Sequence, residues 1–307
     1  MLERRDLVQL DTELRETWGI DVGSLECPDW WESLEDECPP GLVNRFVEVH
    51  RAYVASEVNG GSESRMAERA FFDLVADERL LGRVHAHRRP VIVDTAAFVD
   101  ELVMDRGITG PVLDAGCHAG YLSAWWARHP QLDVVGSDRS LAALELGRRQ
   151  CAALGRRVEL VEADLLSGDQ RRDFGLIVAV DVLPEEIESG LEGLQRLAHG
   201  LADDGYLVLS TGHPLDVAWH PLERVFKTLG ELGLGFVQAG CLGGVVAPGL
   251  EPWGQNAFVL RRGQASAFCR EHIAESRRDW PGFLDFAADP EVPVREKTVA
   301  WFRACRG

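Results

Sequence analysis

The sequence predicts an α/β fold built on a doubly wound, mostly parallel sheet and preceded by a helical region. Two observations support this prediction. From Pro111 onward, strand-like and helix-like segments alternate, which is typical of a parallel sheet with helices on both faces. In residues 1 to 90, by contrast, the apolar residues follow helical spacing and no strand-like alternation persists.

The stretch Val112–Gly120 (VLDAGCHAG) is the point around which this pattern is arranged. It predicts a strand, then a tight loop of small residues, and then a helix that begins at Tyr121. Small residues would let a ligand lie directly against main-chain N–H groups at the positive end of that helix. In open α/β sheets ligands bind at the carboxyl ends of the strands, so we expect a binding site here.

The other elements follow in chain order. A helix over Asp94–Gly107 begins at a good capping residue and ends at a glycine. Helical spacing also indicates helices near residues 7–18, 42–58 and 66–81. Strands are expected at 111–115, 132–138, 157–164, 173–182, 205–213, 234–242 and 256–263, and helices at 121–128, 140–155, 186–201, 222–232 and 265–278. We divide the chain into a helical region (1–90), a core (91–263) and a C-terminal helical extension (264–307).

Composition narrows the classes of function. The 307 residues are 46% hydrophobic, which is enough for a sizeable core, and they carry a formal net charge of −18. Since nucleic-acid binding depends on Lys and Arg contacts with phosphates, we expect no nucleic-acid partner. No apolar run approaches the roughly 20 residues of a membrane-spanning helix, and the charged N-terminus has no secretory core. We therefore expect a cytoplasmic protein without a membrane partner.

Patterns for metal binding are weak. The seven cysteines are odd in number and form no CxxC pair, which favours reduced, mostly buried thiols over a zinc ribbon or a disulfide framework. His85 and His87 form an HxH pattern, but the neighbouring arginines make a solvated basic turn the more typical interpretation. We therefore expect no metal site.

Two acidic residues extend the expected binding site. Asp138 ends the second strand, about 20 residues after the small-residue loop, the interval at which an acidic side chain reaches ribose hydroxyls. Asp164 ends the third strand, where it would receive the exocyclic amine of a base. The alternative for either residue is a cap on the next turn, although Ser140 is the better helix cap after the second strand.

Five segments in order, DAGCHAG, VVGSDRS, VEADLL, DFGLIVAVDVL and DDGYLVLSTGH, resemble the class I S-adenosylmethionine-dependent methyltransferases. The resemblance covers about residues 92–263. It implies a seven-stranded sheet whose last strand is antiparallel, and S-adenosylmethionine as the cofactor. The cofactor-binding residues that it implies by position are Asp114, Ala115, Gly116, Cys117, His118, Gly120, Asp138, Arg139, Asp164, Leu165 and Val180.

The resemblance also implies a role for each part of this set. Asp114 and Gly116 would line the methionine end of the cofactor, and Asp138 would hold the ribose. Asp164 with Leu165 would bind adenine, and the main chain near Val180 would meet the sulfonium side.

His118 departs from the family pattern, which most often has a small residue at this position. Its imidazole points away from the loop, contacts the methionine carboxylate, or narrows the pocket, and the sequence leaves these alternatives open. A dinucleotide site is a weaker hypothesis, because Gly116 and Gly120 do not complete a G-x-G-x-x-G pattern.

Asp181 and His213 are the candidates for acid–base chemistry, because they follow the fourth and fifth strands and should face the acceptor beyond the cofactor. A histidine titrates near neutral pH and can take a proton as the methyl group arrives. The alternative for His213 is a structural imidazole before Pro214. A base is also dispensable if alignment of donor and acceptor is sufficient.

Tryptophans are the candidates for an acceptor wall. Trp30 and Trp31 lie in an irregular segment, and Trp219 and Trp253 lie in loops near the expected pocket. In the pair Trp125–Trp126, which lies on a helix that must pack on the sheet, one ring is expected in the core.

We expect a methyltransferase that acts on a small, apolar or aromatic metabolite, covered by the helical N-terminal region as a lid. The same region is a candidate for homodimer formation. Alternatives are a peptide, protein or carrier-bound acceptor, or a non-catalytic scaffold or regulatory protein with the same fold. Fold alone does not settle the acceptor atom, which can be oxygen, nitrogen, carbon or sulfur.

Overall fold

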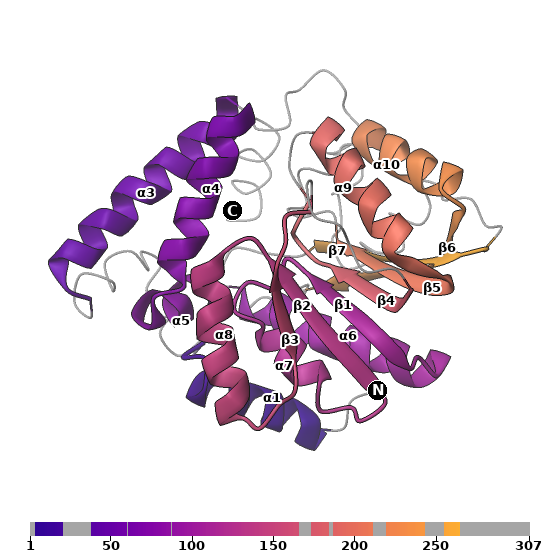
Figure 1. Cartoon of the computed structure of the whole chain (residues 1–307), viewed down its shortest axis with the longest axis horizontal. Helices are drawn as coiled ribbons and strands as arrows, with labels where there is room; N and C mark the ends of the chain where they lie inside the picture. Colours follow the sequence, from indigo (N-terminus) through magenta and orange to yellow (C-terminus); the bar gives the residue numbers. More distant parts are fainter. Residues whose placement is uncertain are drawn as a thin grey trace, which may run out of the picture. The chain divides into compact units, whose positions relative to one another are not determined.

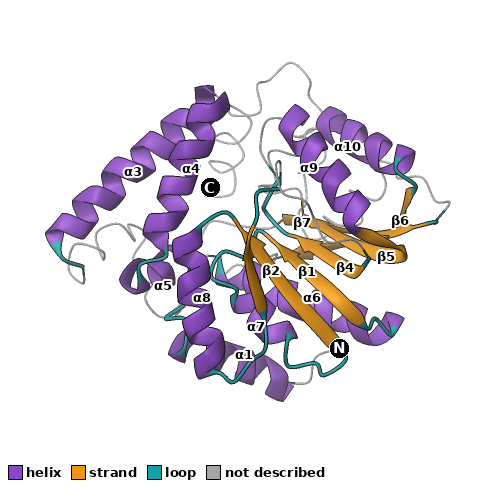
Figure 2. Ribbon diagram, in the orientation of Figure 1, coloured by secondary structure: helices purple, strands orange, loops and turns teal. Residues whose placement is uncertain are grey.

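A computed structural model of the chain describes residues 4–20, 38–59, 61–86, 88–165, 173–183, 187–210, 219–242 and 255–264. Its strands form one seven-stranded sheet in the order β3-β2-β1-β4-β5-β7-β6 (Figure 2). The mostly parallel α/β fold expected from the sequence is confirmed, as is the helical N-terminal region. The proposed helix at 265–278, the C-terminal extension and the loops around His213 and Trp253 lie outside the described residues.

The chain divides into two compact units, which comprise residues 1–107 with 116–164 and residues 108–115 with 165–307. The first unit contains the N-terminal helices and the strands β2 and β3 (Figure 1). Its elements are α1 (Arg4–Glu16), α3 (Pro40–Asn59), α4 (Gly61–Val75), α5 (Glu78–Ala86), α6 (Arg89–Arg106), α7 (Tyr121–Trp126), β2 (Leu132–Asp138), α8 (Leu141–Ala153) and β3 (Glu159–Glu162).

The second unit contains most of the sheet. Its elements are β1 (Gly110–Ala115), β4 (Phe174–Ala179), α9 (Ile187–Gly200), β5 (Leu201–Ser210), α10 (Trp219–Glu231), β6 (Leu234–Leu242) and β7 (Gln255–Arg262). The strand β4 pairs in parallel with both β1 and β5. The last strand, β7, is antiparallel to β5 and to β6, as the resemblance implies. Leu176, Ile177 and Val178 of β4 are buried, in agreement with a central strand that is apolar on both faces.

The helical spacing at the N-terminus correctly predicts which side chains are buried. Leu10 and Leu14 of α1 are each 1% exposed, and Trp18 just after the helix is 3% exposed. The turn that follows α1 lies very close to α5: a Cβ at Gly82 would be 2.0 Å from the carbonyl oxygen of Gly19. Only glycine permits this approach between the two segments.

Several predicted helix boundaries differ from the structure, most of all those of α4, α5 and α6. The expected helix over 66–81 is two helices, because Asp77 interrupts it and its carboxylate accepts the N–H of Arg79 at the start of α5. The helix expected from Asp94 begins five residues earlier, at Arg89. Proline in the first turn of α6 is compatible with a helix start, because an N–H there has no helical acceptor. The predicted end at Gly107 is confirmed, with a φ of 61°.

Strand ends also differ from the prediction. β3 ends at Glu162 rather than at Asp164, because the N–H of Ala163 turns to the carbonyl oxygen of Asp138. β5 begins at Leu201, four residues before the expected start. In the described parts of the chain, no helix is long and apolar enough to cross a membrane.

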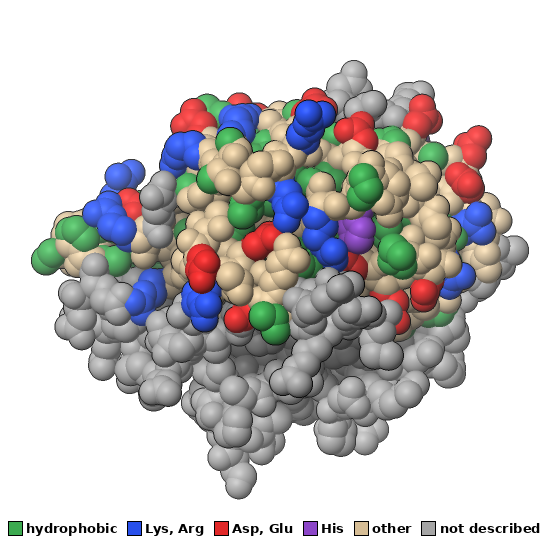
Figure 3. Space-filling view, turned by 90° about the horizontal axis from the view of Figure 1, so that it is seen from below, with side chains coloured by type: hydrophobic (Ala, Val, Ile, Leu, Met, Phe, Trp, Pro, Cys, Tyr) green, Lys and Arg blue, Asp and Glu red, His purple; other side chains and the backbone are tan. Residues whose placement is uncertain are grey.

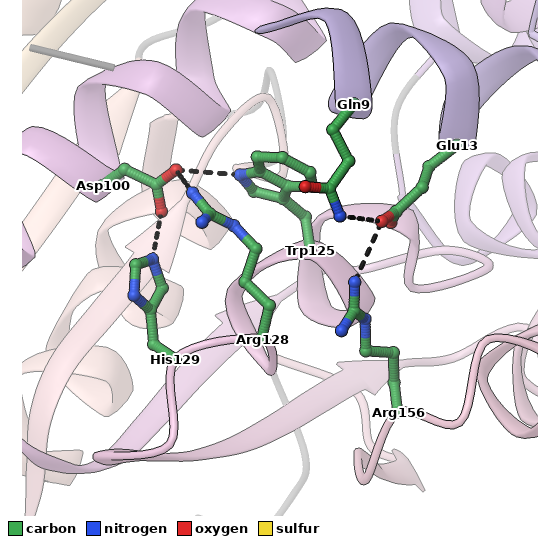
Figure 4. A network of polar contacts seen from close by, with 7 residues as sticks. All are labelled: Gln9, Glu13, Asp100, Trp125, Arg128, His129 and Arg156. Carbon is green, nitrogen blue, oxygen red and sulfur yellow. Dashed lines mark hydrogen bonds and ion pairs between the residues drawn. The ribbon is translucent and has the colours of Figure 1, made fainter. Parts of the chain in front are cut away.

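A buried carboxylate links α6 to α7 and to the turn after α7. Asp100 is 2% exposed and accepts from the indole N–H of Trp125 at 2.9 Å, from Arg128, and from His129 at 2.8 Å (Figure 4). A second cluster in the same figure joins α1 to the segment after α8 through the carboxylate of Glu13, which is 2.9 Å from Arg156. Each of these two carboxylates thus accepts from an arginine of the first unit.

We predict that Asp100→Ala lowers the free energy of unfolding by about 3 kcal/mol, because it leaves a buried indole N–H and a partly buried guanidinium without their acceptor. Urea denaturation measures the loss. Asp105→Ala, at an exposed position of the same helix, is the control and should change stability by less than about 0.5 kcal/mol. Equal losses in the two variants would contradict the prediction.

Candidate functional site

The loop Gly116–Gly120 follows β1 and has an unusual backbone conformation. Gly116 and Gly120 have φ values of 72° and 76°, and His118 between them has a φ of 49°. Glycine adopts this left-handed region at no steric cost, whereas other residues occupy it uncommonly. The small residues of the motif are therefore required by the turn itself.

Most N–H groups of this loop are already engaged within the protein. Those of Gly116 and Cys117 donate to the carbonyl oxygen of Ser137, and that of Gly120 donates to the carbonyl oxygen of Cys117. The N–H of His118 donates to Asp138. Three of these four donors hold the loop against β2, and the N–H of Gly120 closes the loop on itself. Contact of a ligand with the main chain of this loop stays a prediction.

Glycines of the neighbouring elements α8 and β2 allow close packing beneath the loop. A Cβ at Gly147 of α8 would lie 2.3 Å from the carbonyl oxygen of Ala119. A Cβ at Gly136 of β2 would lie 2.9 Å from the sulfur of Cys117 and 2.8 Å from the hydroxyl of Ser123. Both contacts are too short for any residue other than glycine, so α8 and β2 support the loop directly.

Asp138 lies at the end of β2, as predicted, and fixes the surrounding backbone. Its Oδ2 accepts the N–H of His118 at 2.8 Å, and its Oδ1 accepts the N–H of Ser140 at 2.8 Å. A carboxylate has about four acceptor positions, so two remain for other donors. Ser140 is the N-cap of α8, with its hydroxyl oxygen accepting from the N–H of Ala143. The sequence interpretation of Ser140 as the helix cap is therefore confirmed.

His118 directs its imidazole into the N-terminal helices. Nε2 lies 3.2 Å from the carbonyl oxygen of Phe72 in α4, and the ring lies edge-on to the ring of Phe72. The ring of His85 in α5 is 5.1 Å away, centroid to centroid. The side chain is thus buried against α4 and α5, and of the three alternatives the structure favours an imidazole that points away from the loop.

Burial lowers the pKa of His118, because a charged imidazole loses solvation there. Asp138, the carbonyl of Phe72 and Asp73 oppose this effect, while Arg88 adds to it. A carbonyl oxygen accepts hydrogen bonds, so Nε2 carries the proton and Nδ1 is the bare nitrogen. Nδ1 is buried without a hydrogen-bond partner among the described residues, which suits the neutral form of the ring.

The end of β3 and the residue after Asp138 meet helix α4. Arg139 forms an ion pair with Glu68 of α4, and Glu162 at the end of β3 pairs with Arg69 of the same helix at 3.1 Å. Asp164 is half-buried and follows Ala163, whose N–H is bonded to the main chain of Asp138. Within the first unit, Arg139 and Ala163, the neighbour of Asp164, thus lie next to Asp138, which in turn bonds to the loop.

The remaining predicted residues of the second unit lie at strand ends. Asp114 and Ala115 end β1 and are buried, and Asp114 is opposite Val178 of β4 in the sheet register. Val180 and Asp181 follow β4. Asp181 is exposed and has a φ of 56°, a conformation that a non-glycine residue adopts only when its surroundings hold it there.

Several predicted residues cannot be placed. His213, Trp30, Trp31 and Trp253 lie outside the described residues. The expectation that Trp219 lies in a loop is wrong, because the helix expected over 222–232 begins three residues earlier and Trp219 is the first residue of α10; its side chain is not described. Leu165 is half-buried in the turn after β3.

Two sequence interpretations need correction. Both rings of the Trp125–Trp126 pair are fully buried, rather than one of them, because α7 is covered on both sides. His85 is buried in α5 and contacts Tyr121 and His118, so it is not part of a solvated turn; His87 lies outside the described residues. Among the residues that the structure describes, no cluster of His, Cys, Asp or Glu could hold a metal ion.

Comparison with known proteins finds a family resemblance for part of the chain. Residues 112–205 match the model of a methyltransferase domain, the stretch that contains the loop, Asp138 and Asp164. This part of the chain is therefore similar to a methyltransferase domain, in agreement with the class I resemblance of the sequence. S-adenosylmethionine is the cofactor of this family.

Part of the chain is also similar to curated proteins that share one name. The ribosomal RNA small subunit methyltransferase C of Citrobacter koseri is 36% identical over 92 residues, which are 30% of this chain and 27% of that protein. Its counterpart in Escherichia coli is 34% identical over 92 residues, 30% of this chain and 26% of that protein. The chain therefore spans about a quarter of the length of these curated relatives.

A solved structure supports the fold. The putative O-methyltransferase from Nostoc punctiforme superposes with a TM-score of 0.52 at 16% identity, and the match covers 75% of this chain and 72% of that chain. At this identity the likeness concerns the architecture and not the substrate.

The sequence interpretation missed the part that α4 plays at the site. Glu68, Arg69, Phe72 and Asp73 contact the loop, β2, β3 or the start of α8, but periodicity marked them only as parts of a helix. A possible signal was the departure of His118 from the family pattern, because a large side chain in a slim loop requires space in a neighbouring element.

We predict that His118 makes folding stability fall as the pH falls below about 6.5, the ordinary pKa of an unfolded-state histidine. In that range the imidazole of His118 binds a proton in the unfolded chain but stays neutral in the folded chain. The free energy of unfolding therefore decreases with decreasing pH. Urea denaturation at pH 7.5 and 5.5 should show that wild type loses up to about 1 kcal/mol more than His118→Asn. Equal losses would contradict this assignment.

Proposed function

We propose that the chain binds S-adenosylmethionine and transfers its methyl group to a small-molecule acceptor. The observation that carries this proposal is Asp138: a carboxylate at the end of β2, beside the left-handed loop, with acceptor positions left after two backbone N–H groups are bound. Such a carboxylate suits the two hydroxyls of a ribose.

The residues of the domain fit the adenosyl group in type and place. Asp138 is half-buried, so its remaining lone pairs are accessible. The bulk of His118 is accommodated by α4 and α5. We assign Asp138 and Arg139 to the ribose side, Asp164 with Leu165 to adenine, and the loop Gly116–Gly120 to the methionine part.

Residues at the ends of β1 and β4 are proposed for the reaction itself. We assign Asp114, Ala115 and the main chain near Val180 to the methionine and sulfonium end, because they lie at the carboxyl ends of β1 and β4. The bound sulfonium supplies an activated methyl group and leaves as a neutral thioether. The protein then has to hold the acceptor atom in line with that methyl group, and Asp181 and His213 are the residues that would remove a proton from it.

A small acceptor fits the charge of the chain. The net charge of −18 opposes binding to a phosphate backbone. On the face shown in Figure 3, Lys and Arg side chains of the described residues alternate with Asp and Glu rather than forming a continuous basic surface. Trp30, Trp31, Trp219 and Trp253 are the proposed wall for an apolar or aromatic acceptor, and the N-terminal helices are the proposed cover and dimer contact.

A second candidate is an RNA acceptor, which the named relatives favour. They are named as ribosomal RNA methyltransferases, but the match covers only 92 residues, 27% and 26% of the length of those proteins. The choice can be tested with tritiated S-adenosylmethionine, offered with either a small-metabolite extract or purified small-subunit ribosomal RNA. Label in the RNA alone would replace the first candidate by the second.

We predict that isothermal calorimetry detects binding of both S-adenosylmethionine and S-adenosylhomocysteine, with dissociation constants in the micromolar range. The physical reason is a preformed loop and carboxylate at the strand ends. Absence of heat, together with an unchanged melting temperature in excess ligand, would favour a non-catalytic scaffold.

We predict that Asp138→Asn raises the dissociation constant of S-adenosylhomocysteine at least tenfold, because a charged acceptor of two hydroxyls is lost. In Asp138→Asn the amide NH₂ replaces one of the two carboxylate oxygens that accept backbone N–H groups, so one of these hydrogen bonds is lost. We therefore expect the melting temperature to be lower by a few degrees. Asp133→Asn, an exposed position of β2, is the matched control and should bind as wild type does. Unchanged affinity in Asp138→Asn would remove the ribose assignment.

A further inference from the structure

Helix α4 meets the methyltransferase domain through one of its faces. Four of its residues have the spacing i, i+1, i+4 and i+5, which places their side chains along one side of a helix. The contacts are Glu68 with Arg139, Arg69 with Glu162, Phe72 with His118, and Asp73 with Ser140. Each partner lies in the cofactor loop or within two residues of the carboxyl end of β2 or β3.

These four contacts differ in strength. Arg69 and Glu162 are each 48% exposed, so their ion pair contributes little. Ser140 donates its hydroxyl proton to Asp73 at 2.5 Å while its oxygen caps α8, so that contact is part of the helix start. Only His118 comes from the cofactor loop itself, and its side chain is 5% exposed.

Three contacts hold His118 in its left-handed conformation. Its N–H is bonded to Asp138, its Nε2 to the carbonyl of Phe72, and its ring lies between those of Phe72 and His85. A non-glycine residue stays in this region of φ only when its surroundings determine it. Part of that surrounding structure is α4, so the backbone of the loop depends on where α4 lies.

We propose that His118 is a positioning residue that ties the cofactor loop to α4, so that the binding conformation of the loop requires the docked N-terminal helices. The effect on cofactor binding rests on the proposed function, whereas the contacts of His118 with α4 do not depend on it. Because thermodynamic coupling is reciprocal, a cofactor that binds the ordered loop must in turn stabilise α4 in its docked position.

The experiment is hydrogen exchange by mass spectrometry on the full chain, with and without S-adenosylhomocysteine. Wild type, His118→Asn and the control Met104→Ala are compared, since Met104 is 66% exposed on α6. Asparagine tolerates the left-handed backbone, so His118→Asn removes the reach to Phe72 without forcing the loop into another conformation. Exchange is followed over residues 68–75 of α4 and over residues 224–231 of α10 as an internal reference.

In wild type and Met104→Ala, the ligand should slow exchange over 68–75. In His118→Asn this protection should be lost, and the dissociation constant of S-adenosylhomocysteine should rise about fivefold or more. Exchange over 224–231 should be the same in all three proteins. A merely structural role would lower stability without removing the ligand-dependent difference at α4.

Retention of full ligand-dependent protection of α4 in His118→Asn would overturn the proposal. If wild type itself binds no S-adenosylhomocysteine, the proposed function is wrong, and the tie between loop and α4 is then tested by hydrogen exchange in the proteins without ligand. Faster exchange over 68–75 in His118→Asn than in Met104→Ala then supports the tie between loop and helix, and equal exchange overturns it.

Discussion

The carboxylate of Asp138 is the interaction on which the arrangement of the site depends. One oxygen holds the loop through His118, the other holds the start of α8 through Ser140, and the main-chain oxygen of the same residue holds the segment after β3. Three segments that come together only in the folded chain are thus fixed by one residue at the end of one strand. An ionised acceptor is well suited to this task, because hydrogen bonds from N–H groups to a charge are stronger than neutral ones.

The same residue therefore has a structural and a proposed binding role. Acid groups that hold backbone often use all their acceptor positions, but a carboxylate with two backbone donors keeps about two positions. The loop makes the complementary contribution. Its own N–H groups are consumed in holding its shape, so what it would offer a ligand is a close, well-supported surface rather than a row of donors.

The fold was largely predictable from the sequence, and the site only in part. The alternation of apolar strands with amphipathic helices predicts both ends of β2 and of β6 correctly, because buried strands have a clear apolar pattern. The errors arise from individual hydrogen bonds. The carboxylate of Asp77 accepts the N–H of Arg79 at the start of a new helix, and the N–H of Ala163 donates to the carbonyl oxygen of Asp138, where β3 has ended. Such bonds depend on the position of a partner, which periodicity does not report.

The contacts of α4 could not be predicted for the same reason. Glu68 and Asp73 look like ordinary solvent-facing acids of an amphipathic helix, and their partners lie some seventy residues later in the chain. The position of Asp138 at the end of β2 could be predicted because the strand before it has a clear apolar pattern, whereas its role toward a ligand stays a prediction. The orientation of His118 had no such rule, since a side chain in a loop takes the space that other segments leave.

The approach of α8 to the loop limits how this region can move. A Cβ at Gly147 would lie 2.3 Å from the carbonyl oxygen of Ala119, so there is no space for a side chain between helix and loop. A movement of the loop toward α8 would therefore also have to displace the helix.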